Sequence, residues 1–188
     1  MAFFEKDIEA LLEAVNKVGR TIEAQAVIEL QALAMYDYSL YKRIEEEYGE
    51  EEARQIHKKV WLKHVLDYIN EGKEDLGFEK INDIQGLGLI TKLAFEKRGC
   101  IFDIVEITPE RFVGVITRDA LKEYTEAAFN EKPGSPYMRS LSAASNAIVS
   151  SLVEECGLSE YVEVEQDKSI YLGDEISRII YRDKGGTI

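Results

Sequence analysis

Proline, cysteine, histidine and tryptophan are all scarce in this 188-residue sequence, and each scarcity narrows what the chain can be. None of the three prolines precedes Pro109, so no proline interrupts helix in the first half of the chain. The two cysteines, Cys100 and Cys156, do not have the spacing of a metal-ligand set. A disulfide between them stays open from the sequence, although a chain that is not secreted favours free thiols.

Long apolar runs and basic clusters are missing as well. No run approaches the length of a membrane span, and the N-terminal segment acquires acidic residues too early for a signal peptide. Basic residues number 23 against 36 acidic ones, a net charge of -13. Nucleic acid and anionic membranes need a positive surface, so neither is an expected partner. We expect a cytoplasmic protein whose partner is a small-molecule ligand.

The hydrophobic pattern changes from helical to β-like near residue 99. At 45% hydrophobic residues, the chain can bury a sizeable core and suits one domain over residues 1–188. We expect residues 1–48 to form a helical extension or dimer arm, and 49–183 to form the core. Helices are expected over 7–23, 24–48, 50–71, 83–97, 120–130 and 136–156. Strands are expected over 100–107, 111–119, 161–165, 169–172 and 176–182.

This order of elements predicts an α+β protein. Its helical N-terminal half is followed by an antiparallel sheet, made of a hairpin, two helices and further strands, and covered by helices. Asn82 or Asp83 is a candidate N-cap for one helix, and Ser135 followed by Pro136 is a candidate cap and first turn for another.

The only tryptophan and the only two histidines occur within eight residues, as His57, Trp61 and His64. On a continuous helix all three share one face with apolar residues, and a second apolar face lies opposite. Three interpretations stay open: core histidines with satisfied hydrogen bonds, histidines lining a ligand pocket, and a metal site. Histidines seven positions apart lie about 10 Å apart along the helix axis, which is unsuitable for one ion. We therefore expect no metal.

Two strand ends carry polar side chains suited to binding or catalysis. IleThrArgAsp at 116–119 places Arg118 and Asp119 before a helix, and Ser177 opens the last strand. The guanidinium of Arg118 suits a substrate carboxylate, and Asp119 or His64 could act as a base. The alternative for Arg118 and Asp119 is a charge pair at the strand end, with Asp119 as the helix cap.

These stretches resemble the family of L-2-amino-thiazoline-4-carboxylic acid hydrolases over roughly residues 45–183. The residues that carry the resemblance are GlyGluGluGluAlaArg at 49–54, IleThrArgAsp at 116–119, ValGluGluCysGlyLeu at 153–158 and LeuGlyAspGluIleSerArgIleIleTyr at 172–181. Asp119 and Ser177 stand where the family tends to have cysteine. The family's chemistry, if it uses those thiols, is therefore either lost here or replaced by carboxylate and hydroxyl.

The resemblance implies a small-molecule hydrolase that acts on a small carboxylate-bearing ring or an amide-like C–N bond. His64 and Asp119 are then the expected catalytic residues, and Trp61, Arg118, Ser177 and His57 the expected substrate-binding residues. No cofactor is expected. The alternatives are a non-catalytic small-molecule-binding or regulatory protein on the same scaffold, and a homodimeric interaction protein. The homodimer would bury Tyr36, Tyr38 and Tyr41 between the N-terminal helices of two chains.

Overall fold

The computed structural model describes residues 22–63 and 65–185, with side chains from residue 29 onward. The helix expected over 7–23 lies almost wholly outside these residues. The helices are α2 (Ile22–Tyr48), α3 (Glu50–Leu62), α4 (Val65–Leu76), α5 (Ile84–Lys97), α6 (Ala120–Phe129) and α7 (Pro136–Glu155). The strands are β1 (Cys100–Ile107), β2 (Arg111–Asp119), β3 (Val162–Lys168) and β4 (Ser177–Asp183).

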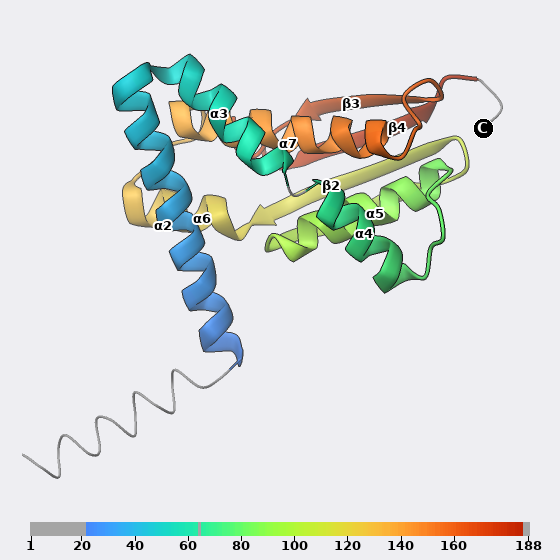
Figure 1. Cartoon of the computed structure of the whole chain (residues 1–188), viewed down its shortest axis with the longest axis horizontal. Helices are drawn as coiled ribbons and strands as arrows, with labels where there is room; N and C mark the ends of the chain where they lie inside the picture. The colour runs from blue at the N-terminus through green and yellow to red at the C-terminus, as the bar shows by residue number, and fades with distance from the viewer. Residues whose placement is uncertain (1–21, 64, 186–188) are drawn as a thin grey trace, which may run out of the picture.

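The four strands form one antiparallel sheet in the order β1-β2-β4-β3. β4, the last strand, lies between β2 and β3, so the chain leaves the sheet after β2 and returns through α6 and α7 (Figure 1). α5 packs on β1, β2 and β4, while α7 contacts β3 and is covered by α3. This arrangement confirms the predicted α+β class. Of the two cap candidates Asn82 and Asp83, Asp83 caps α5, and the cap predicted at Ser135 is also confirmed, because each side chain accepts a backbone N–H three residues on.

Aromatic side chains fill the space between α5 and the sheet. Phe102 on β1, Phe112 on β2 and Tyr181 on β4 are all buried, with the ring centroid of Phe112 6.3 Å from Phe102 and 5.6 Å from Tyr181. α5 comes close to these rings because Gly88 has no side chain. A Cβ at Gly88 would lie 2.2 Å from Cδ2 of Phe112. Close packing of large rings therefore depends on a small residue opposite them.

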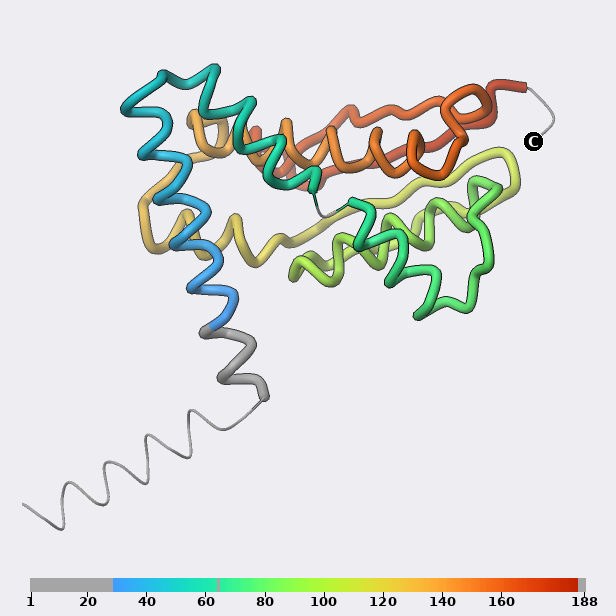
Figure 2. The backbone as a smooth tube through the Cα atoms, viewed as in Figure 1, coloured from blue at the N-terminus to red at the C-terminus, as the bar shows by residue number. Residues whose placement is uncertain are grey.

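The continuous helix expected over 50–71 is wrong. The helix ends at Leu62, a new one begins at Val65, and it continues to Leu76. Gly72, the residue just after the expected end of this helix, lies inside α4, where a Cβ would be 2.5 Å from Cδ1 of Ile90 on α5. The two helices pack differently, because α3 packs on α2 and α7 whereas α4 packs on α5 and α7 (Figure 2).

The strand expected at 169–172 is also wrong, because these residues form a turn. Ile170 and Tyr171 are buried, which explains the apolar signal. Their backbone is held by side chains instead of a strand ladder. The hydroxyl of Ser177 accepts the N–H of Ile170, and the carboxylate of Asp174 accepts the N–H of Ser169.

The second half of the expected N-terminal extension packs as core. Ala34 and Tyr41 of α2 belong to the same buried cluster as the sheet residues. Tyr41 is buried within the chain, and the ring of Tyr38 stacks on Phe129 at 4.2 Å, so neither is available to a second chain as expected. Tyr36 is 79% exposed. No helix in the described part of the chain is long and apolar enough to span a membrane.

Replacing Gly88 by alanine should destabilise the fold, because the added methyl group collides with the ring of Phe112. We expect the free energy of unfolding to fall by about 1–3 kcal/mol. Gly86→Ala in the same helix is the matched control, because its Cβ would have 3.2 Å to the nearest atom and alanine favours helix. Urea denaturation of both variants checks this, and equal stability of the two would contradict it.

Candidate functional site

A buried carboxylate links three helices on one side of the molecule. Asp37 on α2 accepts the hydroxyl of Tyr137 on α7 at 2.6 Å, and its oxygens lie 2.9 and 3.0 Å from Nε2 of His57 on α3. Nδ1 of His57 is 2.7 Å from the hydroxyl of Ser140 on α7. Burial, and next the negative charge of Asp37, hold the pKa of Tyr137 far above its usual value, so Tyr137 acts as a donor.

The ring of His57 has more hydrogen-bonding neighbours than its nitrogens can pair with. Nε2 lies within hydrogen-bonding distance of Asp37 and also 3.0 Å from Nε1 of Trp61. One ring nitrogen either donates a proton or accepts one, so it cannot serve both groups. The bond to the carboxylate is the stronger, because it is charge-assisted. The indole N–H of Trp61 is then poorly satisfied, at a point where Asp37 and Trp61 line a cavity.

The guanidinium group of Arg98 stacks on the ring of Trp61. The guanidinium carbon of Arg98, just after α5, is 4.2 Å from the centroid of the Trp61 ring and 5.3 Å from that of Phe95. Nε and Nη1 of Arg98 have almost no solvent-exposed surface and no hydrogen-bond acceptor among the described residues. Leaving a buried donor unpaired costs about 1–3 kcal/mol, and more when the group is charged. Stacking offsets part of this cost.

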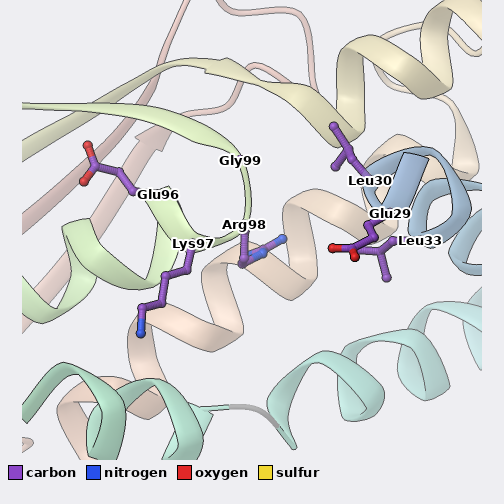
Figure 3. Close-up of a pocket in the computed structure, with 7 residues that line it drawn as sticks. All are labelled: Glu29, Leu30, Leu33, Glu96, Lys97, Arg98 and Gly99. Atoms are coloured by element: carbon purple, nitrogen blue, oxygen red, sulfur yellow. The ribbon is translucent and has the colours of Figure 1, made fainter. Parts of the chain in front are cut away.

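Two cavities adjoin at Leu33 of α2. The larger, of about 480 Å³, is lined by Leu30 and Leu33 on one wall and by Arg98 on the other (Figure 3). The smaller, of about 200 Å³, is lined by Leu33, Trp61 and Asp37 among others. We call these two adjoining cavities the Trp61–Arg98 cleft. Its walls come from α2, α3, α4 and the α5–β1 turn, so they are far apart in sequence.

A second buried carboxylate, that of Asp119, lies between the sheet and α6. Its Oδ1 accepts the N–H of Lys122, as a helix cap does. Its Oδ2 accepts the hydroxyl of Tyr171 at 2.5 Å and the thiol of Cys100 at 3.2 Å. Burial, and next Asp119, raise the pKa of Cys100 far above its usual value, so this thiol stays protonated and is a poor nucleophile.

The structure places the expected site residues in different surroundings. His57 and Trp61 are both buried in the helical half. Arg118 is exposed, and its Nε donates to Glu123 at 2.7 Å. Ser177 is buried and holds the turn before β4, while His64 lies outside the described residues. The lining of the Trp61–Arg98 cleft includes neither Arg118 nor Ser177, so they are not brought together with Trp61 as expected.

Several residues of this region could not be identified as site residues from the sequence. Asp37 and Tyr137 are a hundred positions apart, and Arg98 reads as an ordinary charged residue after a helix. The crowding of His57 and Trp61 was the only visible indication. Both cysteines are free. Within residues 22–63 and 65–185, no three His, Cys, Asp or Glu side chains gather as a set of metal ligands, and the absence of a metal stays a prediction.

Comparison with known proteins finds similarity in structure. No protein-family model and no curated protein sequence match the chain. A trafficking protein particle complex subunit 3 from Naegleria fowleri, covalently bound to palmitic acid, is 20% identical, with a TM-score of 0.55 over 84% of this chain and 96% of its own. The phenol-responsive sensory domain of the transcription activator PoxR, with phenol, is 11% identical, with a TM-score of 0.53 over 82% of this chain and 74% of its own. At such identities the similarity shows a shared fold.

Replacing Asp37 by alanine should strongly destabilise the protein. The change leaves the hydroxyl of Tyr137 and the ring of His57 buried without their acceptor. We expect a loss of roughly 2–4 kcal/mol in the free energy of unfolding. Asp103→Ala on an exposed position of β1 is the control and should change little. Chemical denaturation measures both, and a loss at Asp37 no larger than at Asp103 would show that the network contributes nothing.

Proposed function

We propose that this protein binds a small, largely apolar molecule in the Trp61–Arg98 cleft and does not catalyse a reaction on it. The observation that carries the proposal is the cleft itself, where Leu33 lines both cavities and Trp61, whose N–H competes with Asp37 for Nε2 of His57, lines the smaller one. Apolar walls with a few polar groups are typical of ligand sites. One of the two similar structures is covalently bound to palmitic acid and the other contains phenol, which supports small-molecule binding on this scaffold.

Hydrolysis, the other function expected from the sequence, has less support. A general base needs a free oxygen within reach of the proton it removes. Asp119 is 1% exposed, and both of its oxygens already accept hydrogen bonds. Arg118 is committed to Glu123 at the surface. The resemblance to the thiazoline carboxylate hydrolases stays a prediction, and the surroundings of these two residues favour a binding protein.

A regulatory role and a homodimer also stay predictions. Of the tyrosines expected between two chains, only Tyr36 remains exposed, alongside Met35 and Leu40 on α2. The molar mass in solution, measured by light scattering, decides whether a second copy covers them.

Leu33 offers a direct test of the proposed site, because it lines both cavities of the cleft and is 48% exposed. Leu33→Glu places a charge on the apolar wall, and the ligand would have to desolvate it. We expect the affinity for apolar probes such as phenol or octanamide to fall by about tenfold or more. The fluorescence of Trp61, the only tryptophan in the chain, reports binding.

Leu40→Glu is the matched control. Leu40 lies on the same helix and is 49% exposed, but it is not among the residues that line the cleft. Both variants should fold, because neither position is buried. If the two changes lower affinity equally, the probes bind elsewhere and the proposed site is wrong.

A further inference from the structure

We infer that the smaller cavity of the Trp61–Arg98 cleft selects small neutral compounds that carry a hydroxyl group, namely alcohols with one ring or a short chain. The hydroxyl donates to the carboxylate of Asp37 and accepts from Trp61 and Tyr68, while the apolar part of the ligand lies against Leu33 and Val60. This inference rests on the proposed function, and it names the class of ligand and the polar groups that recognise it.

The polar groups of the smaller cavity come from three helices. Asp37 on α2, Trp61 on α3 and Tyr68 on α4 line it together with Leu33 and Val60. Oδ1 of Asp37 and Nε1 of Trp61 are each 3.0 Å from the same atom, Nε2 of His57. A ligand oxygen that reaches one of these two atoms is therefore close to the other as well.

The carboxylate of Asp37 has acceptor capacity left. Its two oxygens offer about four lone-pair positions. Its donors among the described residues are the hydroxyl of Tyr137, which binds Oδ2 at 2.6 Å, and Nε2 of His57, which the two oxygens share. Oδ1 therefore has no donor of its own. The side chain of Asp37 is 8% exposed and lines the smaller cavity, so a ligand there has access to it.

Trp61 and Tyr68 supply the donors. The N–H of Trp61 competes with Asp37 for Nε2 of His57, and a ligand oxygen that accepts this N–H removes the conflict. The hydroxyl of Tyr68 has no hydrogen-bond partner among the described residues, and unlike the hydroxyl of Tyr41 it is not closed off from solvent. Burial raises the pKa of Tyr68, so its hydroxyl stays protonated and can donate.

Charges of both signs beside the cavity disfavour an ionic ligand. A carboxylate would meet the negative charge of Asp37, and an ammonium would approach the guanidinium of Arg98, whose carbon is 4.2 Å from the centroid of the Trp61 ring. Either ion would also lose its water in a largely apolar space. A hydroxyl is neutral, and because it both donates and accepts, it matches one acceptor and two donors at once.

The volume limits the rest of the ligand. The smaller cavity holds about 200 Å³, less than the roughly 300–1,000 Å³ of pockets that bind drug-sized molecules. Leu33 and Val60 give it apolar walls. The expected ligands are therefore alcohols with a single ring or a short alkyl chain.

Two pairs of compounds test the inference: benzyl alcohol with ethylbenzene, and cyclohexanol with methylcyclohexane. The members of a pair share shape, and a hydroxyl in one replaces a methyl group in the other. An apolar cavity without hydrogen-bonding groups prefers the hydrocarbon, because the alcohol loses its bonds to water. Titrations of the full chain in sealed cells, followed by calorimetry and by the fluorescence of Trp61, should show the opposite. We expect the alcohol of at least one pair to bind about tenfold more tightly, or better.

Variants of the three polar residues locate the hydroxyl. Tyr68→Phe and Trp61→Phe each remove one donor and keep an aromatic ring, and each should lower the affinity for the alcohol by roughly 3- to 10-fold. Asp37→Asn should lower it by about tenfold or more, because the charge-assisted bond is lost. Binding of the hydrocarbon should change little, which shows that the cavity is intact in a variant. Calorimetry alone follows Trp61→Phe, and thermal unfolding checks that each variant is folded.

Tyr36→Phe is the matched control for Tyr68→Phe. Tyr36 is 79% exposed and lines neither cavity, so the loss of its hydroxyl should leave the preference for the alcohol unchanged. Benzoate and benzylamine are the charged counterparts of benzyl alcohol. Each should bind the parent protein about tenfold more weakly than the alcohol, or worse.

The outcomes separate the two proposals. Tighter binding of the hydrocarbon in both pairs overturns the inference and leaves the cleft as an apolar site, so the proposed function stands. A preference for the alcohol that is unchanged in Tyr68→Phe and Trp61→Phe, or that Tyr36→Phe lowers equally, places the hydroxyl elsewhere and also overturns it. Tighter binding of benzoate or benzylamine than of benzyl alcohol contradicts a neutral ligand. If neither member of either pair binds the parent protein, the proposed function fails along with the inference.

Discussion

The burial of one carboxylate, that of Asp37, constrains the helical half of this protein. A buried carboxylate needs hydrogen-bond donors, so α2, α3 and α7 approach closely enough for Tyr137 and His57 to reach its oxygens. Trp61, four residues after His57 on α3, lines the smaller cavity together with Leu33 and Asp37. The hydrogen-bond network of Asp37 therefore lies directly beside the apolar site.

The carboxylate of Asp119 likewise connects several elements by hydrogen bonds where the helices meet the sheet. Asp119 caps α6, and it also holds Tyr171 and Cys100 beneath the turn in which α5 ends. Arg98 lies between the two carboxylate centres, stacked on Trp61 and near the charge of Asp119. It has compensation for its charge but too few acceptors for its donors. The cleft thus combines apolar walls with one buried cation.

Periodicity predicted most of the elements, and it was wrong where tertiary contacts interrupt a repeating pattern. The hairpin before and after Pro109 and the caps at Asp83 and Ser135 are local features, so they were readable. The expected helix over 50–71 is two helices, of which α3 packs on α2 and α7 and α4 packs on α5 and α7, and periodicity cannot show the break between them. At 169–172 burial alone produced an apolar run, although Asp174 and Ser177 hold it as a turn.

The sequence by itself determined the α+β class, the antiparallel hairpin and the helix caps, because these follow from interactions between residues close in the chain. It also marked the neighbourhood of His57 and Trp61 as unusual. Only the tertiary structure decided that Arg98, and not Arg118, meets Trp61. Both arginines follow or end a regular element, and their sequence surroundings are alike. Arg118 pairs with Glu123 at the surface, whereas the α5–β1 turn carries Arg98 inward, where its Nε and Nη1 have no acceptor among the described residues.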